Sequence, residues 1–271
     1  MSQLAQRDFQ KFAAFIQGAA GIKMPPSKRT MVEGRLRRRL RVLGLDSFEE
    51  YSRFVFDDGG LETEAVAIID ALTTNKTEFF REPEHFRHLA ETVLPAHGID
   101  RAFKVWSAAC SNGAEPYTLA MVLAEQARLV HGFRSQILAT DICTDVLQKA
   151  TLAIYPESWI APVPMDLRHR YLLRSRDRAR AEVRMSPELR RMVRFNRLNL
   201  MDDDYATDRD MDVIFCRNLL IYFDKPTQQK VLGRLCDHLR PGGVLYLGHS
   251  ETIAGLELPL KPIGTTVFRR I

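Results

Sequence analysis

The chain has 271 residues and a formal net charge of +5, and 45% of its residues are hydrophobic while 27% are charged. This composition is typical of a globular protein, and the length suffices for one large domain and a smaller one. No apolar run reaches the ~18 residues of a membrane span, and the polar N-terminus lacks a signal-peptide core, so we expect no insertion into a membrane. The four cysteines are far apart and form no CxxC pair, which favours a reducing, cytoplasmic setting.

Positive charge is concentrated in two segments of the chain. Between Lys23 and Arg41 there are eight basic residues and one acid, and between Met165 and Arg197 there are eleven arginines and four acids. Such clusters indicate an acidic partner surface, either protein or nucleic acid, or they are simply solvated faces. The charges alone leave these alternatives open.

The first ~80 residues predict a small bundle of helices. Apolar residues recur at helical spacing between Phe9 and Ala19. A second helix should follow Ser27, which can cap it, and run to Leu43, where Gly44 is a stop signal. Further helices are expected after Ser47, which forms a capping box with the glutamate three residues later, and over residues 62–72.

The second of these helices is amphipathic. Its apolar residues recur as a stripe along one face, whereas Arg37, Arg38 and Arg41 project from the opposite face. The bundle therefore presents one face rich in arginine.

From residue 84 a different pattern begins. After a helix expected over Glu84–Leu94, strand-like and helix-like runs alternate, which predicts an α/β fold with a doubly wound, mostly parallel sheet. The expected strands are Lys104–Ala109, Gln136–Asp141, Arg194–Leu198, Asp212–Phe215, Val244–Gly248 and Thr265–Arg269. The expected helices are Glu115–Val130, Asp145–Ala150 and Pro226–Arg240. The alternation stops between residues 155 and 193, which indicates a small inserted subdomain.

The turn after the first strand points to a nucleoside ligand. It runs from Ala109 to Glu115 and has one glycine instead of the three of a dinucleotide fingerprint. Glu115 would repel a phosphate but suits a cationic ligand that carries an ammonium and a sulfonium. Asp141 ends the second strand, where a carboxylate can accept hydrogen bonds from ribose hydroxyls. The alternative is that both acids only cap helices.

Two further segments end strands of the predicted sheet with polar side chains. The amide of Asn199 could read an adenine edge, and Arg217 and Asn218 follow another strand. Each could instead be an ordinary turn into a helix. The sequence shows no HExxH and no Ser/His/Asp set, and we expect His85 and His88 on the surface rather than as ligands, so no metal is predicted.

Several segments match one known family in register over nearly the whole chain. They are Thr74–Glu82 (TNKTEFFRE), Val105–Ala120 (VWSAACSNGAEPYTLA), Leu138–Asp145 (LATDICTD), Arg197–Leu200 (RLNL), Asp212–Lys225 (DVIFCRNLLIYFDK) and Leu247–Glu251 (LGHSE). With these motifs the chain resembles the chemotaxis receptor glutamate methyltransferases, the CheR family. The resemblance implies an all-α domain over residues 1–83 and a Rossmann-like methyltransferase domain over residues 84–271, with a small β-subdomain inserted at about 155–193.

The resemblance also implies S-adenosylmethionine (SAM) as the cofactor and S-adenosylhomocysteine as the product. The residues it places in contact with SAM are Asn75, Thr77, Arg81, Glu115, Asp141, Asn199, Leu200, Arg217 and Asn218. Arg81 and Tyr222 should face the methyl-donor end, where Arg81 holds the substrate carboxylate and Tyr222 fixes one of its oxygens. The alternative for Tyr222 is a tyrosine that fills the junction of helix and sheet.

The reaction implied is methylation of glutamate side chains on the cytoplasmic helical bundle of chemoreceptors, which gives methyl esters. Arg37, Arg38 and Arg41 would attract this acidic bundle, and we expect a monomer. In relatives that dock on a receptor pentapeptide, a glycine-rich turn of the inserted subdomain receives the peptide. Residues 173–178 read LRSRDR without glycine, so we predict no pentapeptide tether.

Two other functions remain open at this point. The first is a methyltransferase acting on nucleic acid, although Asn218–Tyr222 lacks the prolines of the Asn/Asp-Pro-Pro-Tyr motif and the basic segments lack interleaved aromatic residues. The second is a SAM-binding module without catalysis, which the presence of Arg81 and Tyr222 disfavours.

Overall fold

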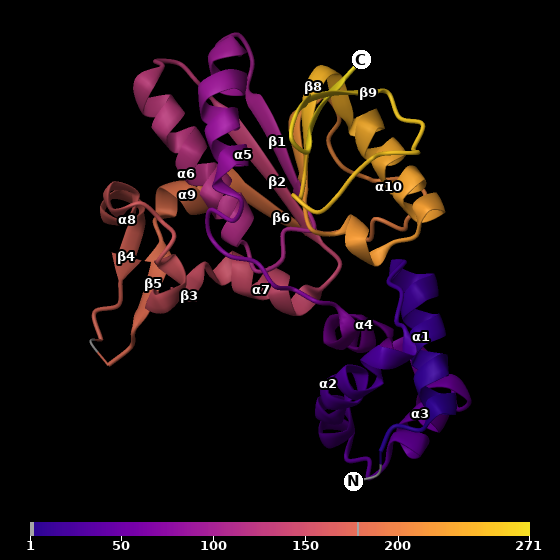
Figure 1. Cartoon of the computed structure of the whole chain (residues 1–271). Coiled ribbons are helices and arrows are strands. Elements are labelled where there is room, and N and C mark those ends of the chain that lie inside the picture. Colours follow the sequence, from indigo (N-terminus) through magenta and orange to yellow (C-terminus); the bar gives the residue numbers. More distant parts are fainter. Residues whose placement is uncertain (1–2, 178) are drawn as a thin grey trace.

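The computed structural model describes residues 3–177 and 179–271. It consists of a helical N-terminal domain and an α/β domain. In Figure 1 the helical domain lies below the α/β domain. The N-terminal helices are α1 (Gln6–Ala20), α2 (Arg29–Leu43), α3 (Phe48–Phe56) and α4 (Leu61–Leu72). Within the described residues, no helix combines the length and the apolar character needed to cross a lipid bilayer.

The helical domain follows the predicted pattern, apart from the start of α2. Val32, Leu36 and Leu40 are fully buried, so the apolar stripe of α2 faces the core. The Oγ of Ser47 accepts a hydrogen bond from the backbone N–H of residue 50 (3.1 Å), as expected for a cap of α3. The prediction that Ser27 caps α2 is wrong. Ser27 lies inside a short 3₁₀ turn (Pro26–Lys28), so the helix begins only after this turn.

The α/β domain contains a seven-stranded sheet in the order β6-β2-β1-β7-β8-β10-β9. Its strands are β1 (Phe103–Ala108), β2 (Ser135–Asp141), β6 (Val193–Arg197), β7 (Met211–Cys216), β8 (Leu239–Leu247), β9 (Leu260–Gly264) and β10 (Val267–Arg270). The strands from β6 to β8 are parallel, and β10 runs antiparallel to both neighbours. The helices are α5 (Pro83–His88), α6 (Ala114–Leu129), α7 (Thr144–Leu152) and α10 (Lys225–His238). The predicted doubly wound fold is confirmed.

Three elements differ from the prediction. The helix expected over residues 84–94 is interrupted, because α5 passes into a π-helical turn (Leu89–Val93) and a 3₁₀ turn (Leu94–Ala96). The helix expected to reach Arg240 ends at His238, since pairing of β8 with β7 begins at the next residue and Pro241 cannot continue a helix. The strand β9 was not predicted; it pairs only with β10 at the edge of the sheet.

The inserted segment forms a three-stranded antiparallel sheet in the order β3-β5-β4. Its elements are β3 (Ile154–Pro156), a 3₁₀ turn (Glu157–Ile160), α8 (Met165–Tyr171), β4 (Leu172–Arg174), β5 (Glu182–Met185) and α9 (Pro187–Met192). The segment without glycine, residues 173–178, begins in β4 and continues into the loop before β5; Arg178 lies outside the described residues. The hydroxyl of Tyr155 donates to the carbonyl of Asn112 (2.8 Å) and so ties the subdomain to the first turn of the large sheet.

Polar contacts and a shared hydrophobic core join the helical domain to the carboxyl edge of the sheet. Asp70 in α4 accepts a hydrogen bond from the backbone N–H of Thr144 at the start of α7 (2.8 Å). Asn199, after β6, donates to the carbonyl of Ala19 in α1 (2.7 Å). One continuous core includes side chains from α1 to α4 and from the strands of the large sheet. The segment between the domains, residues 73–82, has no regular structure and crosses this edge.

Candidate active site

A pocket lies between the two domains at the carboxyl ends of β1, β2 and β7. Together with its open mouth it contains about 1070 Å³. All nine residues predicted to contact SAM line it, and Tyr222 lines it as well. The helical domain contributes Ala20, Ile22, Met24 and Lys28. Residues more than 200 positions apart in the sequence therefore meet at one site, while the role of each stays a prediction.

The first wall of the pocket is the turn between β1 and α6. Ala109 and Ser111 have positive φ angles (65° and 50°), which side-chain-bearing residues rarely adopt. Gly113 also has a positive φ (90°), and a Cβ there would lie 2.8 Å from the Tyr155 hydroxyl, so this position requires glycine. The turn thus has a strained backbone of the kind found at ligand sites.

Asp141 holds this turn in place. Its Oδ2 accepts a hydrogen bond from the N–H of Ser111 (2.8 Å), and its Oδ1 accepts one from the N–H of Cys143 (2.9 Å). Burial raises the pKa of Asp141, and the two N–H donors oppose this rise. Each carboxylate oxygen has a second lone pair that remains available to a ligand hydroxyl.

Glu115, Arg217 and Glu82 form a buried charge network beside the pocket. Ser107 donates a hydrogen bond to Glu115 (2.7 Å), and Arg217 bridges Glu115 (3.1 Å) and Glu82 (3.0 Å). The guanidinium of Arg217 lies over the rings of Phe86 and Phe215 with 1% of its side chain exposed. Burial raises the pKa of Glu115, and Arg217 opposes this rise.

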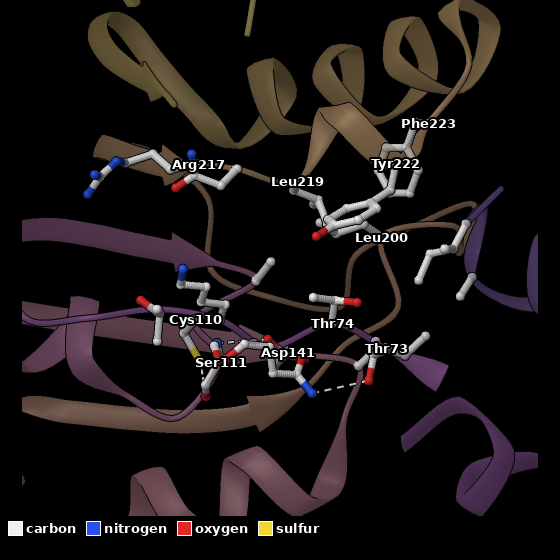
Figure 2. Close-up of a pocket in the computed structure, with 18 of the residues that line it drawn as sticks. Thr73, Thr74, Cys110, Ser111, Asp141, Leu200, Arg217, Leu219, Tyr222 and Phe223 are labelled. Atoms are coloured by element: carbon white, nitrogen blue, oxygen red, sulfur yellow. Dashed lines mark hydrogen bonds between the residues drawn. The ribbon is translucent and has the colours of Figure 1, made fainter. Parts of the chain in front are cut away.

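The side chain of Arg217 therefore does not point into the pocket. Figure 2 shows it leading away, while the main chain of this residue lines the cavity. The motif matches alone did not indicate this orientation. In this structure the guanidinium orients Glu115, and SAM would meet Arg217 mainly through its backbone.

Two acids that the sequence analysis left without a role support the turn after β7. Glu251, 6% exposed, accepts hydrogen bonds from the N–H groups of Asn218 (2.9 Å), Leu220 (2.7 Å) and Gly248 (2.6 Å). Glu82 accepts one from the side-chain amide of Asn218 (3.1 Å). Both acids end segments that match the family, TNKTEFFRE and LGHSE, and that position was the only signal for them.

The expectation that His85 lies on the surface is wrong, since 2% of its side chain is exposed. The inner face of α5 packs on β8, where the His85 ring lies 5.5 Å from the ring of Tyr246. Burial, together with the charge of Arg217, lowers the pKa of His85 to about 4, so its imidazole is neutral at pH 7. His88 is half-buried and lies 2.8 Å from the Tyr246 hydroxyl.

The amides predicted to bind SAM already have protein partners. Asn199 accepts from the N–H of Met201 (3.0 Å) in addition to its bond with Ala19, which leaves its amide one N–H and one lone pair for a ligand. The amide of Asn75 donates to Thr73 (3.2 Å), and the Asn75 carbonyl accepts from the Ser111 hydroxyl (2.8 Å). These bonds fix the segment between the domains against the first turn.

Arg81 and Tyr222 line the same pocket. A guanidinium nitrogen of Arg81 donates to the carbonyl of Lys76 (3.0 Å), which leaves its charge available to an acidic ligand. Tyr222 ends a 3₁₀ turn (Leu220–Tyr222), and the amine of Lys28 lies 5.6 Å from the centre of its ring. In Figure 2 Tyr222 faces Asp141 and Ser111 across the cavity.

The arginines predicted to meet the substrate lie on α2. Arg38 and Arg41 are exposed, whereas Arg37 is half-buried and forms an ion pair with Glu33 one turn earlier. Arg39 is structural, because it bonds to the buried carboxylate of Glu64 (2.6 Å).

Two family models match almost the whole chain. The CheR methyltransferase all-alpha domain matches residues 7–73, and the CheR methyltransferase SAM binding domain matches residues 75–269. The chain belongs to the CheR methyltransferase family. The CheR resemblance stated from the motifs is therefore confirmed, and so is SAM as the cofactor.

Relatives of this CheR-family chain act in chemotaxis. A chemotaxis protein methyltransferase of Salmonella typhimurium is 40% identical over 265 residues, which cover 98% of this chain and 90% of the relative. Chemotaxis protein methyltransferase 2 of Pseudomonas aeruginosa is 38% identical over 265 residues, which cover 97% and 92%. A solved structure, the glycopeptide N-methyltransferase MtfA complexed with sinefungin, is 13% identical with a TM-score of 0.39 and covers 74% of this chain and 62% of MtfA.

The pocket fits SAM in its chemistry. Glu115 lines the turn where an ammonium group can approach, and Asp141 offers carboxylate lone pairs to ribose hydroxyls. Apolar side chains of Ile22, Met24 and Ile142 provide surface for a purine ring. This CheR-family chain is thus a SAM-dependent methyltransferase, and its pocket is built by both domains.

Proposed function

We propose that the protein methylates glutamate side-chain carboxylates on the cytoplasmic helical bundle of chemoreceptors, giving glutamate methyl esters. The observation that carries this proposal is that Arg81 and Tyr222 line the same pocket as the residues predicted to bind SAM. An arginine attracts and orients a carboxylate, and a tyrosine hydroxyl can donate a hydrogen bond to one of its oxygens. A family of chemotaxis methyltransferases supplies the context.

The reaction requires positioning rather than proton transfer. A glutamate with an ordinary pKa of about 4.3 is already ionised at pH 7 and needs no general base. Bound SAM would supply its methyl group to one carboxylate oxygen and leave as S-adenosylhomocysteine, whose sulfur would keep the electron pair of the broken carbon–sulfur bond. Arg81 and Tyr222 hold the carboxylate in line with that bond and replace its water shell.

Arg38 and Arg41, with Arg37 beside them, provide the docking face for the receptor. They project from the exposed side of α2, whose first turn adjoins Lys28 at the mouth of the pocket. Receptor methylation sites lie on helices rich in glutamate, so opposite charge would guide such a helix toward the pocket.

Methylation proceeds without a pentapeptide tether. The end of β4 and the turn after it carry Arg174, Ser175, Arg176 and Asp177, and none of these residues has the backbone freedom of glycine. Calorimetry with the receptor pentapeptide should therefore show no binding at micromolar concentrations. Micromolar affinity would contradict this part of the proposal and leave the methylation reaction unaffected.

The proposal is tested with methyl-labelled SAM and purified cytoplasmic fragments of candidate receptors. We expect label in the receptor that mild base releases as methanol, because a carboxyl ester hydrolyses under these conditions. A receptor whose methylation-site glutamates are replaced by alanine should take up no label and serves as the control. Label that survives base, or that enters the alanine variant equally, would refute glutamate methylation.

A further inference from the structure

Glu82, His85 and His249 converge beside the charge network of the pocket. One potential ligand atom from each, a carboxylate oxygen and two imidazole nitrogens, lies within 4.8 Å of the other two. The Nδ1 of His85 is 3.5 Å from the Oε2 of Glu82, and the Nε2 of His249 is 4.0 Å from the same oxygen. Ligands that bind one zinc ion at about 2.0–2.1 Å lie about 3.3 Å apart in a tetrahedral arrangement. The three atoms are therefore close to the separations that a bound ion needs.

The hydrogen bonds of His85 identify which nitrogen carries a lone pair. Its Nε2 is 3.0 Å from the hydroxyl oxygen of Thr266, and that hydroxyl donates its own proton to the carbonyl of Thr265 (2.8 Å). With Nε2 as the donor to Thr266, the lone pair of the neutral ring is on Nδ1. This arrangement matches that of metal-binding histidines, whose second nitrogen donates to a fixed acceptor.

The lone pair on Nδ1 faces a carboxylate oxygen. Only 2% of the His85 side chain is exposed, so water does not reach this nitrogen freely. Within the described residues it also has no hydrogen-bond partner. Two electron-rich atoms that face each other at 3.5 Å repel one another unless a cation lies between them. A buried polar atom without a partner is costly, which indicates a ligand for it.

We propose that Glu82, His85 and His249 form a binding site for a divalent transition metal of the zinc type. Two imidazoles and a carboxylate are a common zinc ligand set, which leaves one coordination position for water. His249 is 49% exposed at the side chain, so the ion enters from solvent on its side. The carboxylates of Glu82 and Glu115 are negative and the guanidinium of Arg217 is positive, so together they offset part of the added charge.

The metal site is coupled to the cofactor pocket through Glu82. The Oε2 of Glu82 accepts from Arg217 (3.0 Å), and its Oε1 accepts from the amide of Asn218 (3.1 Å). A metal ion on Oε2 withdraws charge from the carboxylate and repels the guanidinium, which also holds Glu115 (3.1 Å). Occupation of the site therefore loosens two segments that line the pocket and lowers the affinity for SAM. By linkage, SAM lowers the affinity for the metal equally.

The test is calorimetry with zinc chloride on chelator-treated protein that carries no polyhistidine tag. We expect one zinc ion per chain. His249→Ala removes the exposed ligand and should weaken binding at least tenfold. His131→Ala, which removes an exposed histidine outside the cluster, should bind zinc as the wild type does. Circular dichroism confirms that each variant is folded.

A second titration measures the coupling. The dissociation constant of SAM should rise severalfold when zinc is present, and this rise should be absent in His249→Ala. Absence of zinc binding, or equal zinc affinity in all three proteins, would overturn the proposed site. Zinc binding that leaves SAM affinity unchanged would overturn the coupling. Neither readout uses a receptor, so these results are independent of glutamate methylation.

Discussion

In the proposed reaction, Arg81 and Tyr222 hold the substrate carboxylate beside the methyl donor. Within the described residues the guanidinium of Arg81 forms no ion pair with a carboxylate, and Tyr222 faces Asp141 across the cavity (Figure 2). Because a positioned charge acts on the reacting carboxylate directly, its removal affects turnover more than the loss of one neutral hydrogen bond does.

For Arg81→Ala we expect a fall in kcat of about 100-fold, and for Tyr222→Phe a fall of about tenfold, in receptor methylation. Tyr222→Phe should leave the dissociation constant of SAM unchanged, because it keeps the ring. Ile221→Ala, whose exposed side chain precedes Tyr222 and does not line the pocket, is the matched control. Wild-type turnover in both active-site variants would remove these residues from the mechanism.

Glu251 has a structural role that a substitution should reveal. Glu251→Ala leaves three buried N–H groups without their acceptor, at a cost of at least about 2 kcal/mol in the free energy of unfolding. It should also weaken SAM binding, since the turn that carries Asn218 loses its anchor. Urea unfolding and SAM titration measure both effects. Glu91→Ala, at an exposed acid, should change neither; equal behaviour of the two variants would contradict the anchor.

At the scale of single residues, sequence motifs indicated which residues line the pocket but not how their side chains point. Arg217 and Asn199 belong to matched segments, yet their side chains bond to the protein. The reason is that side-chain direction depends on the local backbone and on partners distant in the sequence, such as Glu82 for Arg217 and Ala19 for Asn199. The prediction for His85 was wrong because β8, on which α5 packs, determines which face of α5 is buried.

At the scale of elements, one face of α2 packs on the core and the opposite face is exposed to solvent. Val32, Leu36 and Leu40 bind the helix to the core, and Arg38 and Arg41 are exposed to solvent. Periodicity predicted both faces from sequence. It did not predict the break after α5, where the helix passes into a π-helical turn. It also missed β9, which forms a hairpin with β10 but contains Pro262 and Gly264, residues that weaken a strand pattern.

Reversing the charge of Arg37 and Arg38 together should weaken receptor methylation without weakening SAM binding. We expect KM for the receptor to rise several-fold at low salt and less at 0.5 M salt, where charges are screened. Initial rates at both ionic strengths measure this effect. The double reversal of Arg87 and Arg128, which lie on α5 and α6, is the control. A loss of SAM affinity in the α2 variant would instead assign these arginines to the fold.

At the scale of the whole molecule, the pocket depends on contact between the domains. The α/β sheet supplies the floor, and the helical domain supplies a wall through Ala20, Ile22 and Met24. Alternation of strands and helices predicted the sheet, whereas the closing of the pocket by the first helices arises from packing between segments far apart in the chain.

Asp70→Ala should loosen this contact, because it removes the acceptor for Thr144 at the start of α7. If the substitution reduces the free energy of SAM binding by about 1 kcal/mol, the dissociation constant of SAM rises roughly fivefold. Asp57→Ala, which breaks an exposed ion pair with Lys11 inside the helical domain, should leave SAM affinity unchanged. Fluorescence or calorimetric titration with SAM distinguishes the two variants, and equal affinities would show that the contact does not shape the pocket.

The wall formed by Ala20, Ile22 and Met24 limits how such an enzyme can change its target during evolution. Recombination that exchanges the helical domain between relatives would also exchange one side of the cofactor pocket, and the hybrid would bind SAM poorly until both halves readapted. Substitution on the outer face of α2 should leave SAM affinity unchanged, because Arg38 and Arg41 are exposed and do not line the pocket. New receptor preferences should therefore arise by point changes on that face rather than by domain shuffling.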